Sequence, residues 1–147
     1  LASGLTIGAS IDQWVSNALG SLFEASQIAA REGVHAMTDV TGFGLAGHIH
    51  EMLSGKNLGM QWAEKIRTFP GVDACTAQGI HSTAYADNVR YAQQIGHKAP
   101  SAVVFDPQTC GPLLIAAPPE IAKRVIQHWE EAGLSPQQIG VVTTETS

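Results

Sequence analysis

The chain has 147 residues, of which 44% are hydrophobic and 14% charged, a composition typical of one globular domain and not of a disordered chain. A net charge of −5 and eight dispersed basic residues argue against a nucleic-acid surface, because phosphate binding requires clustered Lys and Arg. No apolar run approaches the roughly 20 residues that span a bilayer, and no signal peptide is evident. We therefore expect a single cytoplasmic domain over residues 1–147, without nucleic-acid or membrane partners.

The clearest periodic segment covers residues 11–32 and predicts one amphipathic helix. Its apolar side chains recur three and four residues apart, as they do along one face of a helix. Ser10 begins a capping-box pattern, and Gly33 is a typical helix end. The apolar face consists of Ile11, Trp14, Val15, Ala18, Leu19, Leu22 and Phe23.

Shorter elements follow. Further helices are predicted over residues 45–54, after Pro70, over 84–95, and from Pro119 to Gly133. Strands are predicted from short apolar or alternating runs over residues 34–40, 58–62, 101–105, 113–117 and 139–143. Three tryptophans on apolar faces are expected in the core, namely Trp14, Trp62 and Trp129. Alternating helices and strands predict an α/β or α+β layered domain.

The segment from Asp39 to Gly44 combines residue types that bind metal and phosphate. Asp39 ends a predicted strand, a glycine-containing loop follows, and a helix begins directly after the loop. Glycines let the backbone approach phosphate closely, helix N-terminal N–H groups favour anions, and a carboxylate is a hard oxygen ligand for Mg²⁺. The alternative is that Asp39 caps the helix or fixes the turn, because a short glycine loop is a weak signal.

Two long motifs lie far apart in the chain. The first reads His35-Ala36-Met37-Thr38-Asp39-Val40-Thr41-Gly42-Phe43-Gly44-Leu45-Ala46-Gly47-His48, with Glu51-Met52-Leu53 behind it. The second reads Phe105-Asp106-Pro107-Gln108-Thr109-Cys110-Gly111-Pro112-Leu113-Leu114. Both resemble segments of the selenophosphate synthetases (selenide, water dikinases), in the family's order, and residues 79–83 and 88–90 match more loosely. Two long matches are much more specific than either one alone.

The resemblance implies an α+β domain with helices packed on a mixed, mainly antiparallel sheet, as in C-terminal domains of the aminoimidazole ribonucleotide synthetase superfamily. It implies that Asp39 binds Mg²⁺ and that the loop residues Thr41, Gly42 and Gly44, together with Asp106, bind ATP. The family converts ATP, selenide and water into selenophosphate, phosphate and AMP. Its reactive Cys or selenocysteine and its Lys belong to an N-terminal half, through which the family forms homodimers. We therefore expect no catalytic residue in this chain, and no activity from the chain alone.

The second motif departs from the family pattern at two positions. Cys110 stands where the family usually has Ser, and Pro112 where it has Gly, which removes an N–H donor and backbone freedom. No adjacent cation or helix start activates the Cys110 thiol as a nucleophile. Asp106 either holds the turn or contacts nucleotide. His48 either approaches the first loop and is functional, or lies at the surface or in packing.

Two alternative functions stay open from the sequence. A related ATP-dependent kinase or synthetase that acts on another small molecule would carry a comparable Asp. A degenerate module for dimerisation or regulation would fit the altered 110–112 loop. The intact segment around Asp39 favours a working site for Mg²⁺ and ATP.

Overall fold

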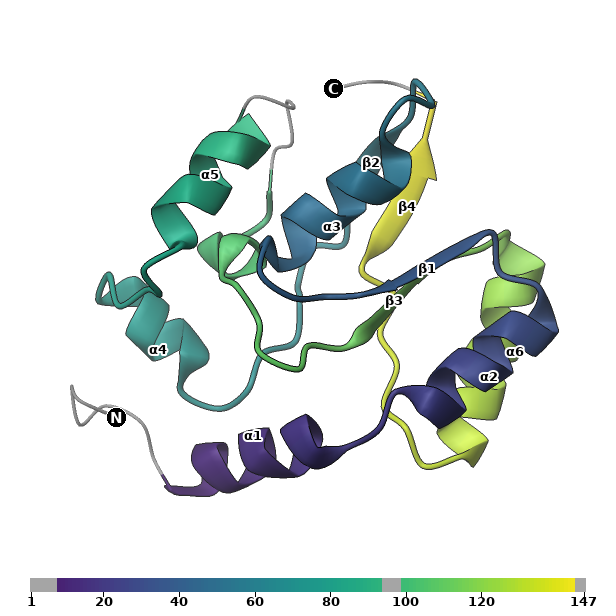
Figure 1. The fold of residues 1–147 in the computed structure, drawn as a ribbon, viewed down its shortest axis with the longest axis horizontal. Coiled ribbons are helices and arrows are strands. Elements are labelled where there is room, and N and C mark those ends of the chain that lie inside the picture. Colours follow the sequence, from purple (N-terminus) through teal and green to yellow (C-terminus); the bar gives the residue numbers. More distant parts are fainter. Residues whose placement is uncertain (1–7, 94–98, 145–147) are drawn as a thin grey trace.

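A computed structural model describes residues 8–93 and 99–144 of the protein (Figure 1). The α-helices are α1 (Gly8–Leu19), α2 (Phe23–Glu32), α3 (Gly44–Leu53), α4 (Val72–Ala77), α5 (Tyr85–Gln93) and α6 (Pro119–Glu131). The strands are β1 (Ala36–Asp39), β2 (Gly59–Trp62), β3 (Leu113–Ala116) and β4 (Gly140–Thr143), and Ala102–Phe105 form a 3₁₀ helix, η1. The end of the predicted 84–95 helix lies outside the described residues. None of the described helices combines the length and apolar character that a membrane span requires.

The strands form two antiparallel ladders. β1 pairs with β3, with Ala36 opposite Ala116 and Asp39 opposite Leu113. β2 pairs with β4, with Gly59 opposite Thr143. Helices and antiparallel strands thus confirm the predicted α+β class, and within the described residues the sheet consists of these two separate ladders.

The β1–β3 ladder separates two hydrophobic clusters, because alternate side chains of a strand point to opposite faces. Leu113 and Ile115 pack against the cluster between α2 and α6, which lie side by side in Figure 1 and bury Ala25, Ile28, Ala29, Val125 and Trp129. Leu114, between them in sequence, belongs to the cluster of Val40, Ile49 and Leu53 near α3. β3 is thus covered on both faces, and its pairing with β1 holds the strand end at Asp39 in place.

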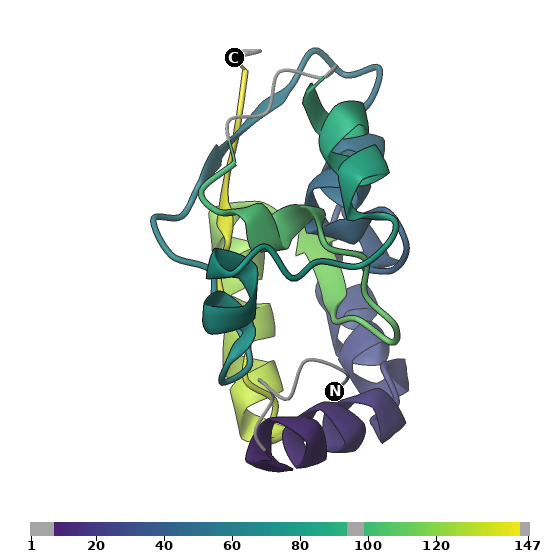
Figure 2. The same cartoon turned by 90° about the vertical axis from the view of Figure 1, so that its left-hand side faces the viewer.

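The predicted continuous helix over residues 11–32 is wrong, because the helix breaks between Leu19 and Phe23. Gly20 in a helix interior destabilises that helix by about 1 kcal/mol relative to Ala. The Ser21 hydroxyl accepts a hydrogen bond from the Phe23 N–H at 3.1 Å, which satisfies one of the free donors at the start of α2. α1 lies at one end of the molecule in both ribbon views (Figure 2).

The break changes which tryptophans are buried. Trp14 on α1 is 45% exposed, so its predicted place in the core is wrong, and Leu19 and Phe23 are exposed as well. Trp129 is buried as predicted, and its indole N–H donates to the Ala25 carbonyl at 3.0 Å. Trp62 is half-buried and packs against the clusters near α3 and η1.

The predicted strand over residues 101–105 is also wrong, because Ala102–Phe105 form η1. A short apolar run has no periodicity that separates a strand from a buried helical turn. Val104 is fully buried against Ala46 of α3, and the Asp106 N–H closes the turn on the Val103 carbonyl at 3.1 Å. Packing against α3 therefore determines the conformation of this segment. The other predicted strands and helices are present near their expected positions.

Candidate functional site

Asp39 occupies the last position of β1 with its side chain exposed. The next residue, Val40, points inward, is fully buried, and donates its N–H to the Pro112 carbonyl at 3.0 Å. This alternation holds the strand end in place and leaves the Asp39 carboxylate facing solvent. Within the described residues, the carboxylate has no hydrogen bond or ion pair to the protein. It is therefore available as an oxygen ligand.

The loop after Asp39 is held by hydrogen bonds from both of its ends. The Thr41 N–H donates to Nε2 of His48 at 3.0 Å, and the Thr41 carbonyl accepts from the Gly44 N–H at 3.1 Å. His48 is buried, and its Nδ1 lies 3.0 Å from a carboxylate oxygen of Glu51 without the alignment of a hydrogen bond. His48 thus contacts the loop from a packed, buried position, and a functional role for it stays a prediction. The imidazole nitrogen that accepts from Thr41 ties the loop to the middle of α3.

The two predicted glycines of the loop differ in their surroundings. Gly44 has a φ of +67°, and a Cβ on it would lie 2.9 Å from the carbonyl oxygens of Val104 and Phe105. Gly42 is exposed, with no atom within 4 Å of the place a Cβ would take. Gly44 is thus required for close packing of α3 on η1, whereas Gly42 leaves the loop backbone open to a ligand.

Asp106 begins the second motif directly after η1. Its carboxylate accepts a hydrogen bond from the Ser82 N–H at 3.3 Å, and its carbonyl accepts from the Gln108 side chain at 3.1 Å. These contacts give the loop-holding role of Asp106 a structural basis. Contact with nucleotide stays a prediction for this residue.

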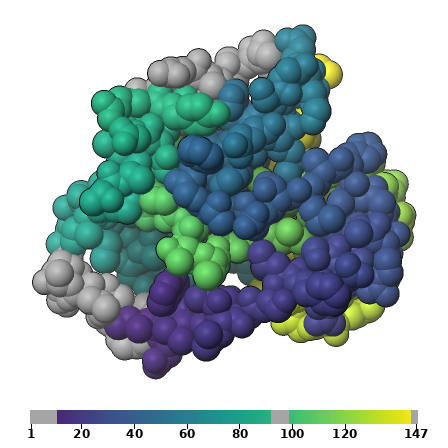
Figure 3. All heavy atoms as spheres, in the orientation of Figure 1, coloured from purple at the N-terminus to yellow at the C-terminus, as the bar shows by residue number. Residues whose placement is uncertain are grey.

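The second motif runs beside the first one. The Gln108 N–H donates to the Thr41 carbonyl at 3.0 Å, and the backbone of Gly111 is so close to β1 that a Cβ there would lie 2.1 Å from the Val40 carbonyl oxygen. Cys110 is exposed and adopts a φ of +57°, which is uncommon for a residue other than glycine. In Figure 3 the green part of the chain that contains this segment reaches the surface between the blue part of the chain and α1. The structure therefore brings the two motifs together.

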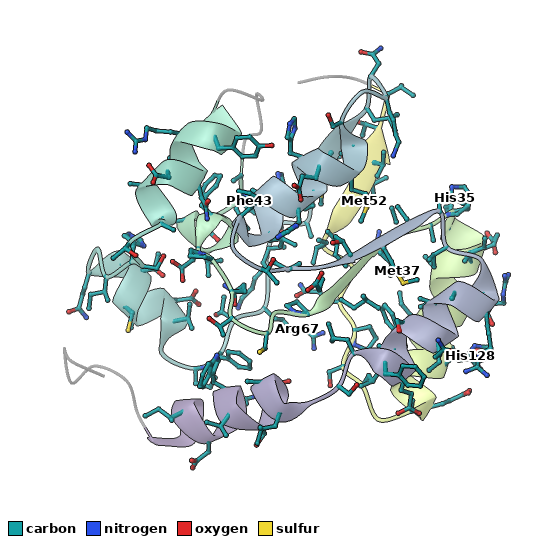
Figure 4. All side chains as sticks on the ribbon, in the orientation of Figure 1. His35, Met37, Phe43, Met52, Arg67 and His128 are labelled. Atoms are coloured by element: carbon teal, nitrogen blue, oxygen red, sulfur yellow. The ribbon has the colours of Figure 1, made fainter. Side chains whose placement is uncertain are left out.

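Asn88 is a residue of this site to which the sequence analysis gave no role, although it lies in the 88–90 segment that loosely matches the family. It lies on α5, is 6% exposed, and donates from its side-chain nitrogen to the Gly42 and Phe105 carbonyls, both at 2.9 Å. The available signal was its position four residues before Ala92, on the face of the predicted helix that was expected to point inward. The Phe43 ring also turns toward α5, with its centroid 6.0 Å from that of Tyr91 (Figure 4).

The fit of the site to Mg²⁺ depends on one carboxylate. In the described part of the chain, no three His, Cys, Asp or Glu side chains gather into a group that could hold a metal. Mg²⁺ commonly takes one or two protein carboxylates and completes its octahedron with water and phosphate oxygens. The unpaired, solvent-facing Asp39 carboxylate fits such a partial site and does not fit an all-protein metal cage.

Comparison with known proteins places this geometry in a family. Residues 13–147 match the family model of the AIR synthase related protein, C-terminal domain. The chain is 38% identical over 128 residues to a selenide, water dikinase of Haemophilus influenzae (strain 86-028NP), an alignment that covers 84% of this chain and 35% of the relative. It is 36% identical over 118 residues to the enzyme of that name from Pseudomonas straminea, covering 75% of this chain and 33% of the relative.

A third relative agrees with these two. The selenide, water dikinase of Burkholderia ambifaria (strain MC40-6) is 39% identical over 116 residues, which is 74% of this chain and 32% of the relative. The chain thus spans about a third of the length of these curated relatives. The family model covers nearly all of the chain, so the chain belongs to the AIR synthase related protein, C-terminal domain family.

Proposed function

We propose that this chain is the C-terminal domain of a selenide, water dikinase and contributes Asp39 and the loop after it to the site for Mg²⁺ and ATP. The proposal is supported by the names of the relatives and by one observation above all, the exposed and unpaired Asp39 carboxylate next to the 41–44 loop. The complete protein would convert ATP, selenide and water into selenophosphate, phosphate and AMP. It would act in the cytoplasm as a homodimer.

The roles of the residues follow from their surroundings. Asp39 would supply one oxygen ligand to Mg²⁺, and the metal would neutralise the polyphosphate charge and orient the phosphorus under attack. The exposed backbone of Gly42 would let phosphate approach, while Thr41 and Gly44 keep the loop in the required shape through the bonds to His48 and within the loop.

Asp106 would border the same site, since its segment is bonded to the 41–44 loop through Gln108. Within these 147 residues we assign no group that reacts with selenide. In the proposed division of roles, this domain binds Mg²⁺ and nucleotide, and the reacting thiol or selenol and the Lys lie in the other part of the complete protein.

The test is made on the protein that carries this chain at its full natural length. Phosphorus NMR follows Mg-ATP with and without selenide under anaerobic conditions, for the wild type, for Asp39→Asn and for a matched control, Asp12→Asn, on the exposed surface of α1. The wild type and the control should form selenophosphate and AMP only when selenide is present. Asp39→Asn should lose this reaction while unfolding at the wild-type temperature, because it removes a ligand charge and no described contact.

Each failure has a distinct meaning. Near-normal turnover by Asp39→Asn would overturn the metal assignment. A folded wild-type protein that leaves ATP intact would overturn the proposed activity, and ATP consumption without selenide would indicate a related enzyme that acts on another small molecule.

A further inference from the structure

Asn88 joins two segments that carry the two motifs of the candidate site. Its side-chain nitrogen donates to the carbonyl of Gly42, in the loop after β1, and to the carbonyl of Phe105, at the end of η1, both at 2.9 Å. Asn88 itself is buried on α5, so water has little access to these bonds. One amide group therefore satisfies two backbone carbonyls from distant parts of the chain.

The chemistry of the two partners determines the orientation of the amide. Both are carbonyl oxygens, which only accept, so the NH₂ group must face them and both of its hydrogens are used. Aspartate at position 88 has nearly the same shape but would direct a carboxylate oxygen at two carbonyl oxygens. Alanine would leave both carbonyls without this partner, and an unpaired buried polar group is strongly unfavourable.

Two further contacts join the same segments. The Gln108 N–H donates to the Thr41 carbonyl at 3.0 Å, and the Gly44 backbone packs directly on Phe105. Among these contacts, only Asn88 uses a side chain that can be replaced without altering the loops themselves. Its removal therefore tests the coupling between the loops and not the loop sequences.

We propose that Asn88 is a positioning residue that holds the 41–44 loop and the 105–108 segment in one relative arrangement, so that both meet the same nucleotide. This inference rests on the proposed function for the nucleotide, but the coupling of the two segments does not. If Asn88 is lost, only a fraction of the molecules has both segments in place. The apparent affinity for Mg-ATP is then the intrinsic affinity multiplied by that fraction, whereas turnover at saturating Mg-ATP is retained.

The experiment compares the wild type, Asn88→Asp and the control Asn17→Asp in the full-length protein. The Asn17→Asp substitution is the same chemical change at an exposed position of α1, where the Asn17 side chain donates a hydrogen bond to the Gln13 carbonyl. Hydrogen exchange is measured at the Gly44 and Gln108 amides, which both donate to the Thr41 carbonyl, and the KM for Mg-ATP and kcat are measured for selenide-dependent turnover.

In Asn88→Asp, the two amides should exchange roughly tenfold faster or more, and KM should rise by a similar factor, since the lost bonds correspond to at least a tenfold change in an equilibrium. Amides of the β2–β4 ladder should exchange as in the wild type, and kcat should change less than KM. A role in global stability alone would speed exchange everywhere and lower kcat through loss of folded enzyme. If Asn88→Asp does not fold, Asn88→Ala provides the same measurements with no added charge.

Exchange and KM in both Asn88 variants equal to those of Asn17→Asp would overturn the inference, as would uniformly faster exchange with unchanged KM. A wild type that does not bind Mg-ATP would overturn the proposed function instead, and the exchange of the Gly44 and Gln108 amides would still decide whether Asn88 couples the two segments.

Discussion

Replacing Gly44 by Ala tests the contact between the 41–44 loop and η1. Gly44 has a φ of +67°, and the added methyl carbon would lie 2.9 Å from the Phe105 carbonyl carbon and oxygen and from the Val104 carbonyl oxygen. These are backbone atoms of a packed turn, so they cannot rotate away as a flexible side chain would. The substitution therefore introduces both backbone strain and a steric clash.

The loss of stability in Gly44→Ala has two parts, the backbone strain and the steric clash. A left-handed backbone with a Cβ is destabilised by roughly 1–2 kcal/mol, and overpacking by one methyl group typically adds about 1–3 kcal/mol. Reduced freedom of the unfolded chain offsets about 0.4–1 kcal/mol of this. We expect Gly44→Ala to lower the free energy of unfolding by about 1–4.5 kcal/mol, less than the 5–15 kcal/mol typical of a folded domain.

Gly133→Ala is the matched control. Gly133 has a φ of +77°, and no atom lies within 4 Å of the place its Cβ would take, so this variant carries the strain without the clash. Urea unfolding gives the free energy of unfolding of both variants. We expect Gly44→Ala to be less stable than Gly133→Ala by about 1–3 kcal/mol. Equal losses in the two variants would refute the close packing of the loop on η1.

Two further predictions concern stability away from the site. Leu19 is 82% exposed, so Leu19→Lys should change the free energy of unfolding by less than about 0.5 kcal/mol, whereas Ile28→Ala in the buried α2–α6 cluster should cost about 2–5 kcal/mol. If urea unfolding showed similar losses for Leu19→Lys and Ile28→Ala, Leu19 would be buried, as the periodicity of residues 11–32 predicts. The Glu32 carboxylate accepts a 2.6 Å hydrogen bond from Arg124 and lies 3.2 Å from His128; chiefly the Arg124 hydrogen bond lowers the pKa of Glu32 below its ordinary 4.5. Because the pKa is lowered, this stabilisation is present above the unfolded-state pKa and is lost as pH falls through the folded-state pKa. In urea unfolding, the wild type should therefore be more stable than Glu32→Gln at roughly pH 6, and this difference should shrink toward roughly pH 3. A difference that stays constant with pH would contradict the prediction.

The local sequence alone predicted much of the fold. Gly33 has the left-handed conformation expected of a helix end, with a φ of +79°, and its N–H bonds back to the last turn of α2. The alternating burial of Leu113, Leu114 and Ile115 on two faces agrees with a strand between two layers. The position of Asp39 at a strand end was also predictable. Helix ends and strand periodicity depend on neighbours in the chain, so residue order is sufficient to predict them.

Contacts between distant segments decided the rest. Nothing near Val104 in sequence shows that Ala46 will bury it in a 3₁₀ turn, and nothing near Gly44 shows that the Phe105 backbone will leave no room for a Cβ. The exposure of Leu19 depends on the break before α2 and on which other parts of the chain pack against that side of α1. The role of Asn88 requires two carbonyls to meet at one amide. The sequence by itself therefore determined most of the helices and strands and the two motifs, and it placed Asp39 at a strand end. The tertiary structure decided the break before α2, the turn at η1 and how the two motifs meet, because packing and burial depend on residues far apart in the chain.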